Sequence, residues 1–247
     1  MKRGTRAAAV VALGVATLAF VRLRGELPVY VRMHRWLRDA GVPDAVRNLD
    51  HYVLLVMAAF GGAMLARTAN PLRTLGFAGS LRQGLVFGLI AGAPMVVMAA
   101  IVHDQVTCSF DVFEGAVLAP FVEETFFRGM LVAAPVACCR APFWRMALLA
   151  GVLFGSAHVS WTRFPDVGAV MTFAVTFAAG VWYAWLMRVY SWSLWPTIAL
   201  HAVMNAAWLV FSIGGGAVGS GLWPNVGRAL TITVGTLLAL RHRRRAS

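Results

Sequence analysis

Long apolar runs, separated by short polar or basic loops, constrain this chain more than any other feature. The runs cover residues 7–22, 52–66, 84–102, 112–137, 143–160, 167–187, 194–213 and 224–240. A helix needs about 20 apolar residues to cross the hydrocarbon core of a bilayer. The chain is 60% hydrophobic and 13% charged, which is far more apolar than a soluble domain. We therefore predict an all-α fold, a polytopic membrane helix bundle of about eight transmembrane helices.

The first 50 residues combine a membrane helix with a charged segment. The N-terminus is basic and then apolar over residues 7–21, as in a cleavable signal peptide. Because Arg22 follows at once, without a small-residue cleavage site, we expect a retained first helix. The stretch over residues 24–50 mixes charges with aromatic side chains, and it predicts an interfacial amphipathic helix that ends near Pro43.

The net charge of +12 is gathered at the two termini and in short loops. These basic residues interrupt apolar runs and form no continuous basic face, so we expect no nucleic-acid partner. Cytoplasmic loops of membrane proteins carry an excess of Lys and Arg. The basic loops at 67–82 and 140–145 therefore predict cytoplasmic termini, and the Ala-, Arg- and Gly-rich composition favours a bacterial inner membrane. The 24–50 segment departs from this rule, because it would face outward with several arginines.

Two adjacent glutamates, Glu123 and Glu124, lie inside an apolar run of a chain that has only ten acidic residues. An ionisable group at membrane depth is costly, so it marks a functional site that faces the protein interior. Residues four apart on a helix share a face, so Glu124 can pair with Arg128, while Glu123 points about 100° away toward another partner. The alternative is that both glutamates only form salt bridges to Arg128 and hold helices together.

Two later helices carry candidate partners for Glu123. His158 ends one apolar run, and His201 and Asn205 share a face of another. Each of them alone would be explained as a hydrogen bond between membrane helices. Three such groups, in a chain that also buries a carboxylate pair, favour one convergent site.

Other polar and aromatic side chains can be explained without a function. Asp104, Asp111 and Glu114 lie beside a helix start, where a cap or the helix dipole accounts for them. Trp182 and Trp185 lie in an apolar run and fit simple packing, although they could instead line a substrate groove.

Three motifs follow one another on successive predicted helices. Residues 123–128 read EETFFR, an EExxxR motif, residues 154–158 read FGSAH, and residues 201–205 read HAVMN. Over residues 80–213 this series resembles the CPBP family of intramembrane glutamic proteases, which includes CAAX prenyl endopeptidases, bacteriocin-processing proteins and Abi-like proteins. The resemblance divides the chain into N-terminal membrane helices with the interfacial segment (1–80), a catalytic helix bundle (81–213), and a final transmembrane helix with a basic cytoplasmic tail (214–247).

The resemblance also implies a role for each motif residue. Glu123 and His158 would hold and activate a water molecule, and His201 and Asn205 would stabilise the oxyanion. Three further residues would support the site: Glu124, Arg128 and Phe154. Peptide hydrolysis needs such a base and such donors, because the carbonyl is a poor electrophile. The expected substrate is a membrane-bound protein or peptide that is cut near its C-terminus.

Two other functions stay open for the sequence. Glu123, His158 and His201 could be three ligands of a zinc ion, although no HExxH motif is present and the resemblance implies no cofactor. The chain could also be a non-catalytic immunity or scaffold protein of the membrane. A proton-relaying transporter is disfavoured, because no paired broken helices or inverted repeat are visible.

Overall fold

The computed structural model describes residues 2–42, 44–47, 49–103, 105–159, 166–213 and 221–246, and every regular element in these ranges is helical. The helices of the N-terminal part are α1 (Arg3–Leu23), η1 (Arg24–Glu26), α2 (Pro28–Asp39), α3 (Asp44–Arg47), α4 (Leu49–Leu65) and α5 (Pro71–Leu75). The middle part contains α6 (Leu81–Val102), α7 (Phe110–Phe113), η2 (Glu114–Leu118), α8 (Ala119–Glu123), η3 (Glu124–Ala133) and α9 (Ala134–Cys139). The last part contains α10 (Phe143–Ala157), α11 (Val167–Val189), α12 (Trp195–Val210) and α13 (Leu222–Ala246). The all-α prediction is confirmed, and each of the eight apolar runs overlaps a helix of the described residues.

The run at 112–137 is interrupted in a way that the sequence pattern did not predict. Its helix changes to π-helical geometry in η2 and again in η3. Each π segment ends two residues before a proline, Pro120 or Pro135. A proline has no backbone N–H and clashes with the carbonyl four residues earlier, so the α-helical ladder cannot pass through it unchanged. The π turns, which are wider than α-helical turns, lie just before these two prolines. Single π turns are frequent at functional sites.

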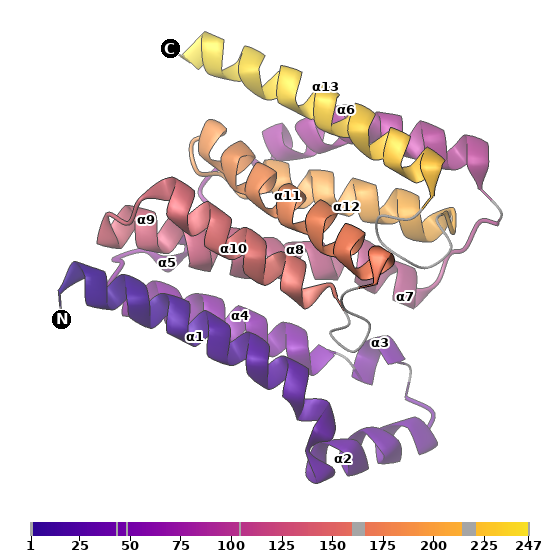
Figure 1. Cartoon of the computed structure of the whole chain (residues 1–247), viewed down its shortest axis with the longest axis horizontal. Coiled ribbons are helices and arrows are strands. Elements are labelled where there is room, and N and C mark those ends of the chain that lie inside the picture. Colours follow the sequence, from indigo (N-terminus) through magenta and orange to yellow (C-terminus); the bar gives the residue numbers. More distant parts are fainter. Residues whose placement is uncertain are drawn as a thin grey trace.

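The helices form a layered bundle around η3 (Figure 1). Helices α1 and α4 lie side by side on one face, and α6 and α13 lie on the opposite face with α12 packed beneath α6. All ten residues of η3 are buried, among them two charged ones. Helices α4, α10 and α11 all contact η3, so its side chains reach elements that are far apart in the sequence.

Small residues let α12 approach α6 closely. Gly84, Gly88 and Gly92 recur every fourth residue on α6 and face α12. A Cβ atom on Gly88 would lie 2.6 Å from the backbone carbonyl carbon of Ala199. Such spacing of small residues lets membrane helices pack backbone to backbone. This contact fixes the height of α12, which carries His201.

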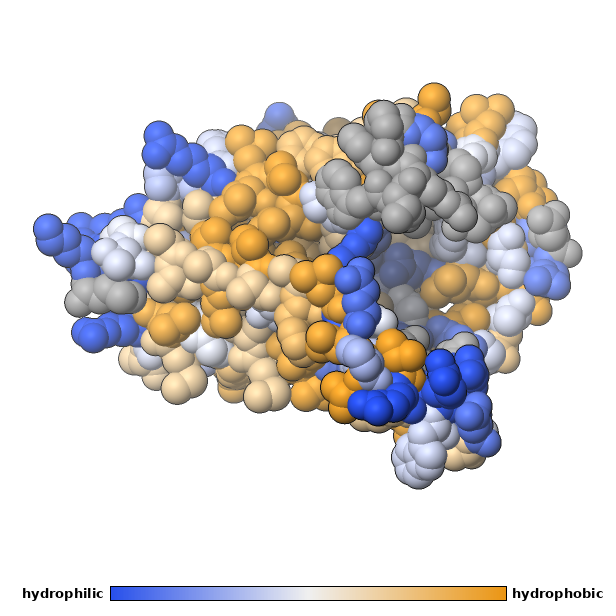
Figure 2. Space-filling model, turned by 60° about the horizontal axis from the view of Figure 1, so that its bottom comes forward, coloured by the Kyte–Doolittle hydropathy of each residue, from blue (hydrophilic) through white to orange (hydrophobic). Residues whose placement is uncertain are grey.

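Three helical segments of the described ranges are long and apolar enough to cross a membrane: Arg3–Glu26, Leu81–Val102 and Val167–Val189. Two shorter apolar helices are Leu49–Leu65 and Phe143–Ala157. On the face seen in Figure 2, hydrophobic residues form a broad band, and hydrophilic residues gather at the two ends of the molecule. This distribution, together with the helical bundle, is that of an integral membrane protein.

The segment after α1 leaves the bundle. Helix α2 contains no buried residue and projects beyond the end of α1 (Figure 1). Its polar and apolar side chains are segregated, as expected for an interfacial amphipathic helix. The predicted stop at Pro43 lies outside the described residues.

Candidate functional site

The pair predicted between Glu124 and Arg128 is present at the centre of the bundle. The Arg128 guanidinium nitrogen lies 3.1 Å from Glu124 Oε1, and both side chains are buried. Among the described residues, no hydrogen bond of good geometry reaches the nitrogens of Arg128. Aromatic rings surround the guanidinium instead, with Phe154 at 4.3 Å and Tyr183 at 5.2 Å from its central carbon. Cation–π contacts of this kind are strongest where water is excluded.

His201 lies against both adjacent glutamates. Its Nδ1 is 2.9 Å from Glu124 Oε1, and its Nε2 is 3.9 Å from Glu123 Oε2. A carboxylate only accepts hydrogen bonds, so in this contact Nδ1 of His201 is the donor. The opposite ring nitrogen therefore faces Glu123 in a fixed orientation.

The two carboxylates have different environments. The Glu124 side chain is 0% exposed, whereas the Glu123 side chain is 22% exposed. The helix geometry that separates neighbouring residues thus leaves one carboxylate in an ion pair and the other at the edge of a space that solvent can reach. Since hydrogen bonds to oxygen span about 2.8 Å, one oxygen atom can contact Glu123 and His201 Nε2 together.

His158 joins this cluster through an aromatic ring. It caps the C-terminal end of α10, where its Nδ1 lies 2.8 Å from the carbonyl oxygen of Phe154. The ring of Phe154 is 4.4 Å from the ring of His158 and 6.2 Å from that of His201, between centroids. Phe154 is therefore the side chain that connects the two histidines.

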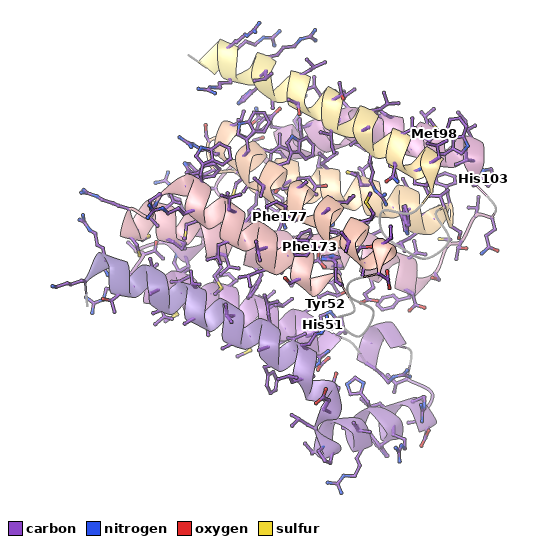
Figure 3. All side chains as sticks on the ribbon, in the orientation of Figure 1. His51, Tyr52, Met98, His103, Phe173 and Phe177 are labelled. Carbon is purple, nitrogen blue, oxygen red and sulfur yellow. The ribbon has the colours of Figure 1, made fainter. Side chains whose placement is uncertain are left out.

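Close packing of α11 on α10 holds this end of α10 in place. Phe173 and Phe177 of α11 stack on each other and lie over Gly155 and Gly151 of α10 (Figure 3). A Cβ atom on Gly155 would come within 3.1 Å of the Phe173 ring. The absence of side chains at these two glycines thus brings the α10 terminus, with His158, against its neighbour.

Asn205 lies one turn beyond His201 on α12, and its amide is partly engaged. Its Nδ2 donates to the backbone carbonyl of Gly115 in η2 at 2.9 Å. An amide group has two N–H donors, so a second donor remains for another acceptor. Asn205 therefore connects α12 to the π-helical segment that precedes Glu123.

Two functional candidates were missed by the sequence analysis. Tyr183 of α11 contacts Arg128 and lies 5.5 Å from the His201 ring between centroids. Tyr52 of α4 donates a 2.6 Å hydrogen bond to Glu114, so the capping interpretation of Glu114 is incomplete. Both tyrosines lie within apolar runs of a chain that has only four, and a buried phenol that needs a partner was the available signal.

The acidic residues near α7 were expected to cap the helix or to interact with its dipole. Ser109 caps α7 with its hydroxyl, whereas Asp111 lies in the first turn, where the helix dipole favours it. Asp104 lies outside the described residues.

Trp182 and Trp185 line a cavity of about 500 Å³ between α10, α11 and α13. Its walls are almost entirely apolar, and it opens on the outer surface of the bundle.

Among the described residues, no three His, Cys, Asp or Glu side chains are placed together as ligands for a metal ion. The cluster of Glu123, Glu124 and His201 is instead completed by Arg128, which is a cation of its own. Such a cluster can hold a water molecule, accept a proton and present donors, which are the parts that acid–base chemistry needs.

An all-helical apolar bundle with a partly buried cluster of carboxylates, histidines and an arginine defines an integral membrane protein with a site suited to acid–base chemistry. Residues 105–207 match the family model of the type II CAAX prenyl endopeptidase Rce1-like proteins, and over this segment the chain is similar to that family of peptide hydrolases. The resemblance to the CPBP and CAAX proteases is thereby confirmed. The match is narrower than residues 80–213, but it contains all three motifs. No curated protein and no solved structure matches the chain.

Proposed function

We propose that this protein is an intramembrane endopeptidase that uses a glutamate-activated water to hydrolyse a peptide bond. The observation that carries the proposal is the placement of His201, whose two ring nitrogens face Glu124 and Glu123. Glu124 and Arg128 neutralise each other, which leaves Glu123 as the carboxylate that is available for chemistry. The family match over the same residues supports the same reaction class.

The proposed reaction uses a small set of side chains. Glu123 takes a proton from water that His158 helps to orient, and the hydroxide attacks the carbonyl carbon of the scissile bond. Negative charge then develops on the carbonyl oxygen, where the second N–H of Asn205 would donate a hydrogen bond, as would Nε2 of His201 once it also carries a proton. When the tetrahedral intermediate collapses, the C–N bond breaks and the proton on Glu123 passes to the leaving amine.

The proposed substrate is a membrane-bound protein or peptide that is cut near its C-terminus. The site lies inside the bundle, so a chain segment that is already in or at the bilayer has the shortest path to it. The family description names CAAX prenyl endopeptidases, which makes a lipid-modified C-terminal peptide one candidate and a C-terminal sorting helix another. The apolar cavity lined by Trp182 and Trp185 is a candidate groove for the apolar part of either.

The proposed setting is a bacterial inner membrane that the chain crosses about eight times, with both termini in the cytoplasm. The basic C-terminal end of α13, with Arg243, Arg244 and Arg245 in its last turn, supports this orientation. In Figure 1 the two termini lie toward the same end of the bundle, and α2 lies toward the other.

Replacing Glu123 with Gln tests the function. The substituted amide keeps the size of the side chain but cannot accept the proton, so we expect cleavage to fall at least 1000-fold while the fold persists. Comparison of membrane-fraction proteins from cells with either form should show an uncut substrate that accumulates with the variant. Glu26→Gln is the matched control, because Glu26 is exposed in η1 and should leave cleavage unchanged.

Two outcomes would contradict the proposal. An identical set of membrane peptides with Glu123→Gln would favour a non-catalytic immunity or scaffold role. Loss of wild-type cleavage after treatment with a strong chelator, restored by zinc, would favour the zinc-dependent version of the same protease. A glutamic protease keeps its activity under that treatment.

A further inference from the structure

Helix α2 carries two faces of opposite character. Val29, Met33 and Trp36 recur at helical spacing on one face, and Val29 and Trp36 are each 67% exposed. The opposite face carries Tyr30, His34 and Arg38 at the same kind of spacing. No residue of α2 is buried by the bundle. An exposed apolar stripe of this size on a projecting helix needs a cover that the bundle does not supply.

The polar face of α2 borders a basic cavity. The cavity has a volume of about 330 Å³ and lies between α2, the elbow that precedes it, and α3. Its lining is Gly25, Tyr30, Val31, His34, Arg35, Arg38 and Arg47. Three guanidinium groups and an imidazole thus border one hollow, and no acidic side chain lines it in the described part of the chain. A cavity of this volume can hold a small ligand or one polar group of a larger ligand.

The acidic residues near this cavity are engaged with particular arginines. Asp50 accepts a 2.7 Å hydrogen bond from Arg24, which is not among the lining residues. Asp39 lies 3.6 Å from Nε of Arg38, and both of these side chains are mostly exposed. An exposed pair of this kind contributes little and can be exchanged for a better anion. Arg47 donates a 2.6 Å hydrogen bond to the carbonyl of Val42 and has a further partner in the chain. Among the described residues, Arg35 forms no ion pair, so part of the positive charge of the cavity comes from Arg35 and from the exposed Arg38.

Two aromatic side chains with polar atoms, Tyr30 and His34, complete the lining. Burial raises the pKa of the Tyr30 phenol, so the phenol stays neutral and keeps its proton at physiological pH. The Nε2 atom of His34 is buried and has no hydrogen-bond partner among the described residues. The rings of Tyr30 and His34 stack at 4.1 Å between centroids. The cavity thus combines guanidinium forks, which bind phosphate oxygens in pairs, with a neutral phenol and an imidazole nitrogen that has no partner among the described residues.

We propose that this cavity binds the phosphate of an anionic phospholipid while the apolar face of α2 lies in the same leaflet. An amphipathic helix in the interface buries its apolar face at the boundary of headgroups and acyl chains, which sets its polar face at the depth of the phosphates. Val29, Met33 and Trp36 face the acyl region, and Arg35, Arg38 and Arg47 face the headgroup. The lipid source of the phosphate is favoured over free phosphate because only a lipid covers both faces.

The proposed site is coupled to the bundle by contacts at the α1 elbow. Arg22 donates a 2.8 Å hydrogen bond to the carbonyl of Val159, the residue after His158. Asp50, which holds Arg24, lies two residues before Tyr52, which holds Glu114. A lipid at this position would sit at the end of the bundle that carries His158 and Glu114. Binding itself does not depend on catalysis.

Lipid retention by the full-length protein in detergent tests the proposal. Native mass spectrometry should show one phosphatidylglycerol retained in preference to phosphatidylcholine. The double variant Arg35→Gln/Arg38→Gln should bind phosphatidylglycerol about 30-fold more weakly, because each basic residue near an anionic headgroup raises the affinity about fivefold. Arg32→Gln is the matched control, because Arg32 is exposed on the same helix but lies outside the cavity.

The other possible results of the lipid-retention experiment each contradict or support the proposal. Equal retention by the double variant and the wild type, or equal retention of the two lipids, would overturn the proposal. Inorganic phosphate at millimolar concentration that displaces phosphatidylglycerol completely would assign the cavity to free phosphate instead. Glu123→Gln should retain the lipid like the wild type, so this test stands whether or not the protein is a protease. A far-UV circular dichroism spectrum of each variant shows that the bundle is intact.

Discussion

Arg128 is the residue on which the site's geometry depends. Its guanidinium is buried, is paired with Glu124, and lies against the rings of Phe154 and Tyr183. A buried charge costs much more when its partner is removed than the intact pair contributes. The ion pair therefore holds Glu124 in place, and Glu124 in turn fixes the orientation of His201.

Glu124→Gln should strongly destabilise the protein. The substitution leaves the guanidinium of Arg128 without a counter-charge, which costs about 3–5 kcal/mol. Thermal unfolding in detergent should show a large drop in Tm, and cleavage should fall because His201 loses its orienting acceptor. The double variant Glu124→Gln/Arg128→Met removes both charges and should regain much of the stability but little of the activity. A single variant as stable as the wild type would show that the pair is not essential to the core.

At the residue scale, sequence reasoning could select the residues of the candidate site but not all of their contacts. Rare acids, histidines and an amide within apolar runs were enough to single out Glu123, Glu124, His158, His201 and Asn205. The contact of His201 with both glutamates, and the bond from Asn205 to Gly115, depend on the relative heights of three helices. Periodicity gives the face of a residue, but it does not give the height of one helix along another.

At the scale of elements, α12 owes its position to the glycines of α6. Gly84 brings the α6 backbone against Trp195 of α12, and Gly88 and Gly92 bring it against Ala199 and Val203. His201 lies between the last two contacts. The catalytic proposal thus depends on residues that have no polar group and no contact with the site.

Gly88→Ala should reduce activity from a distance. The new Cβ atom would lie 2.6 Å from the backbone of Ala199, so α12 has to shift, and overpacking of this kind costs about 1–3 kcal/mol. A displacement of His201 by about 1 Å would lower the rate up to 100-fold. Enzyme assays and Tm measurements on the same preparation check both effects.

Gly61→Ala is the control for this prediction. Gly61 is also a helical glycine, but a Cβ atom there would meet only Leu13 Cδ2 at an ordinary 3.6 Å. Because alanine favours helix over glycine, this variant should be as stable as the wild type or slightly more stable. Equal behaviour of the two variants would contradict the role given to the α6 glycines.

At the scale of the whole molecule, the distribution of charge and hydropathy indicates which end of the bundle faces the cytoplasm. The orientation proposed from the basic loops puts the segment between α6 and α7 on the side of the membrane opposite the cytoplasm. Cys108 lies in that segment and is exposed, whereas Cys138 lies near the basic loop at residues 140–145. The three native cysteines therefore provide a topology probe without any insertion.

A membrane-impermeant maleimide should label intact cells at Cys108. The thiol is exposed, so the reaction should proceed when the reagent is only outside, and it should disappear in Cys108→Ser. Cys138, which is half-buried, should react only after the membrane is permeabilised, whereas Cys139 is buried and should react little in either case. Labelling of Cys108 that requires permeabilisation would reverse the proposed orientation and place α2 on the cytoplasmic side.

The sequence by itself determined the all-helical membrane class, the positions of the apolar helices, and the identity of the polar residues that enter the bilayer. These properties follow from composition and periodicity, because an apolar solvent excludes unpaired polar groups wherever they lie in the chain. Only the tertiary structure decided that η2 and η3 are π-helical, that Tyr183 and Phe154 enclose Arg128, and that His201 faces both glutamates. Those features result from close packing between segments distant in sequence, and local pattern carries no information about such distances.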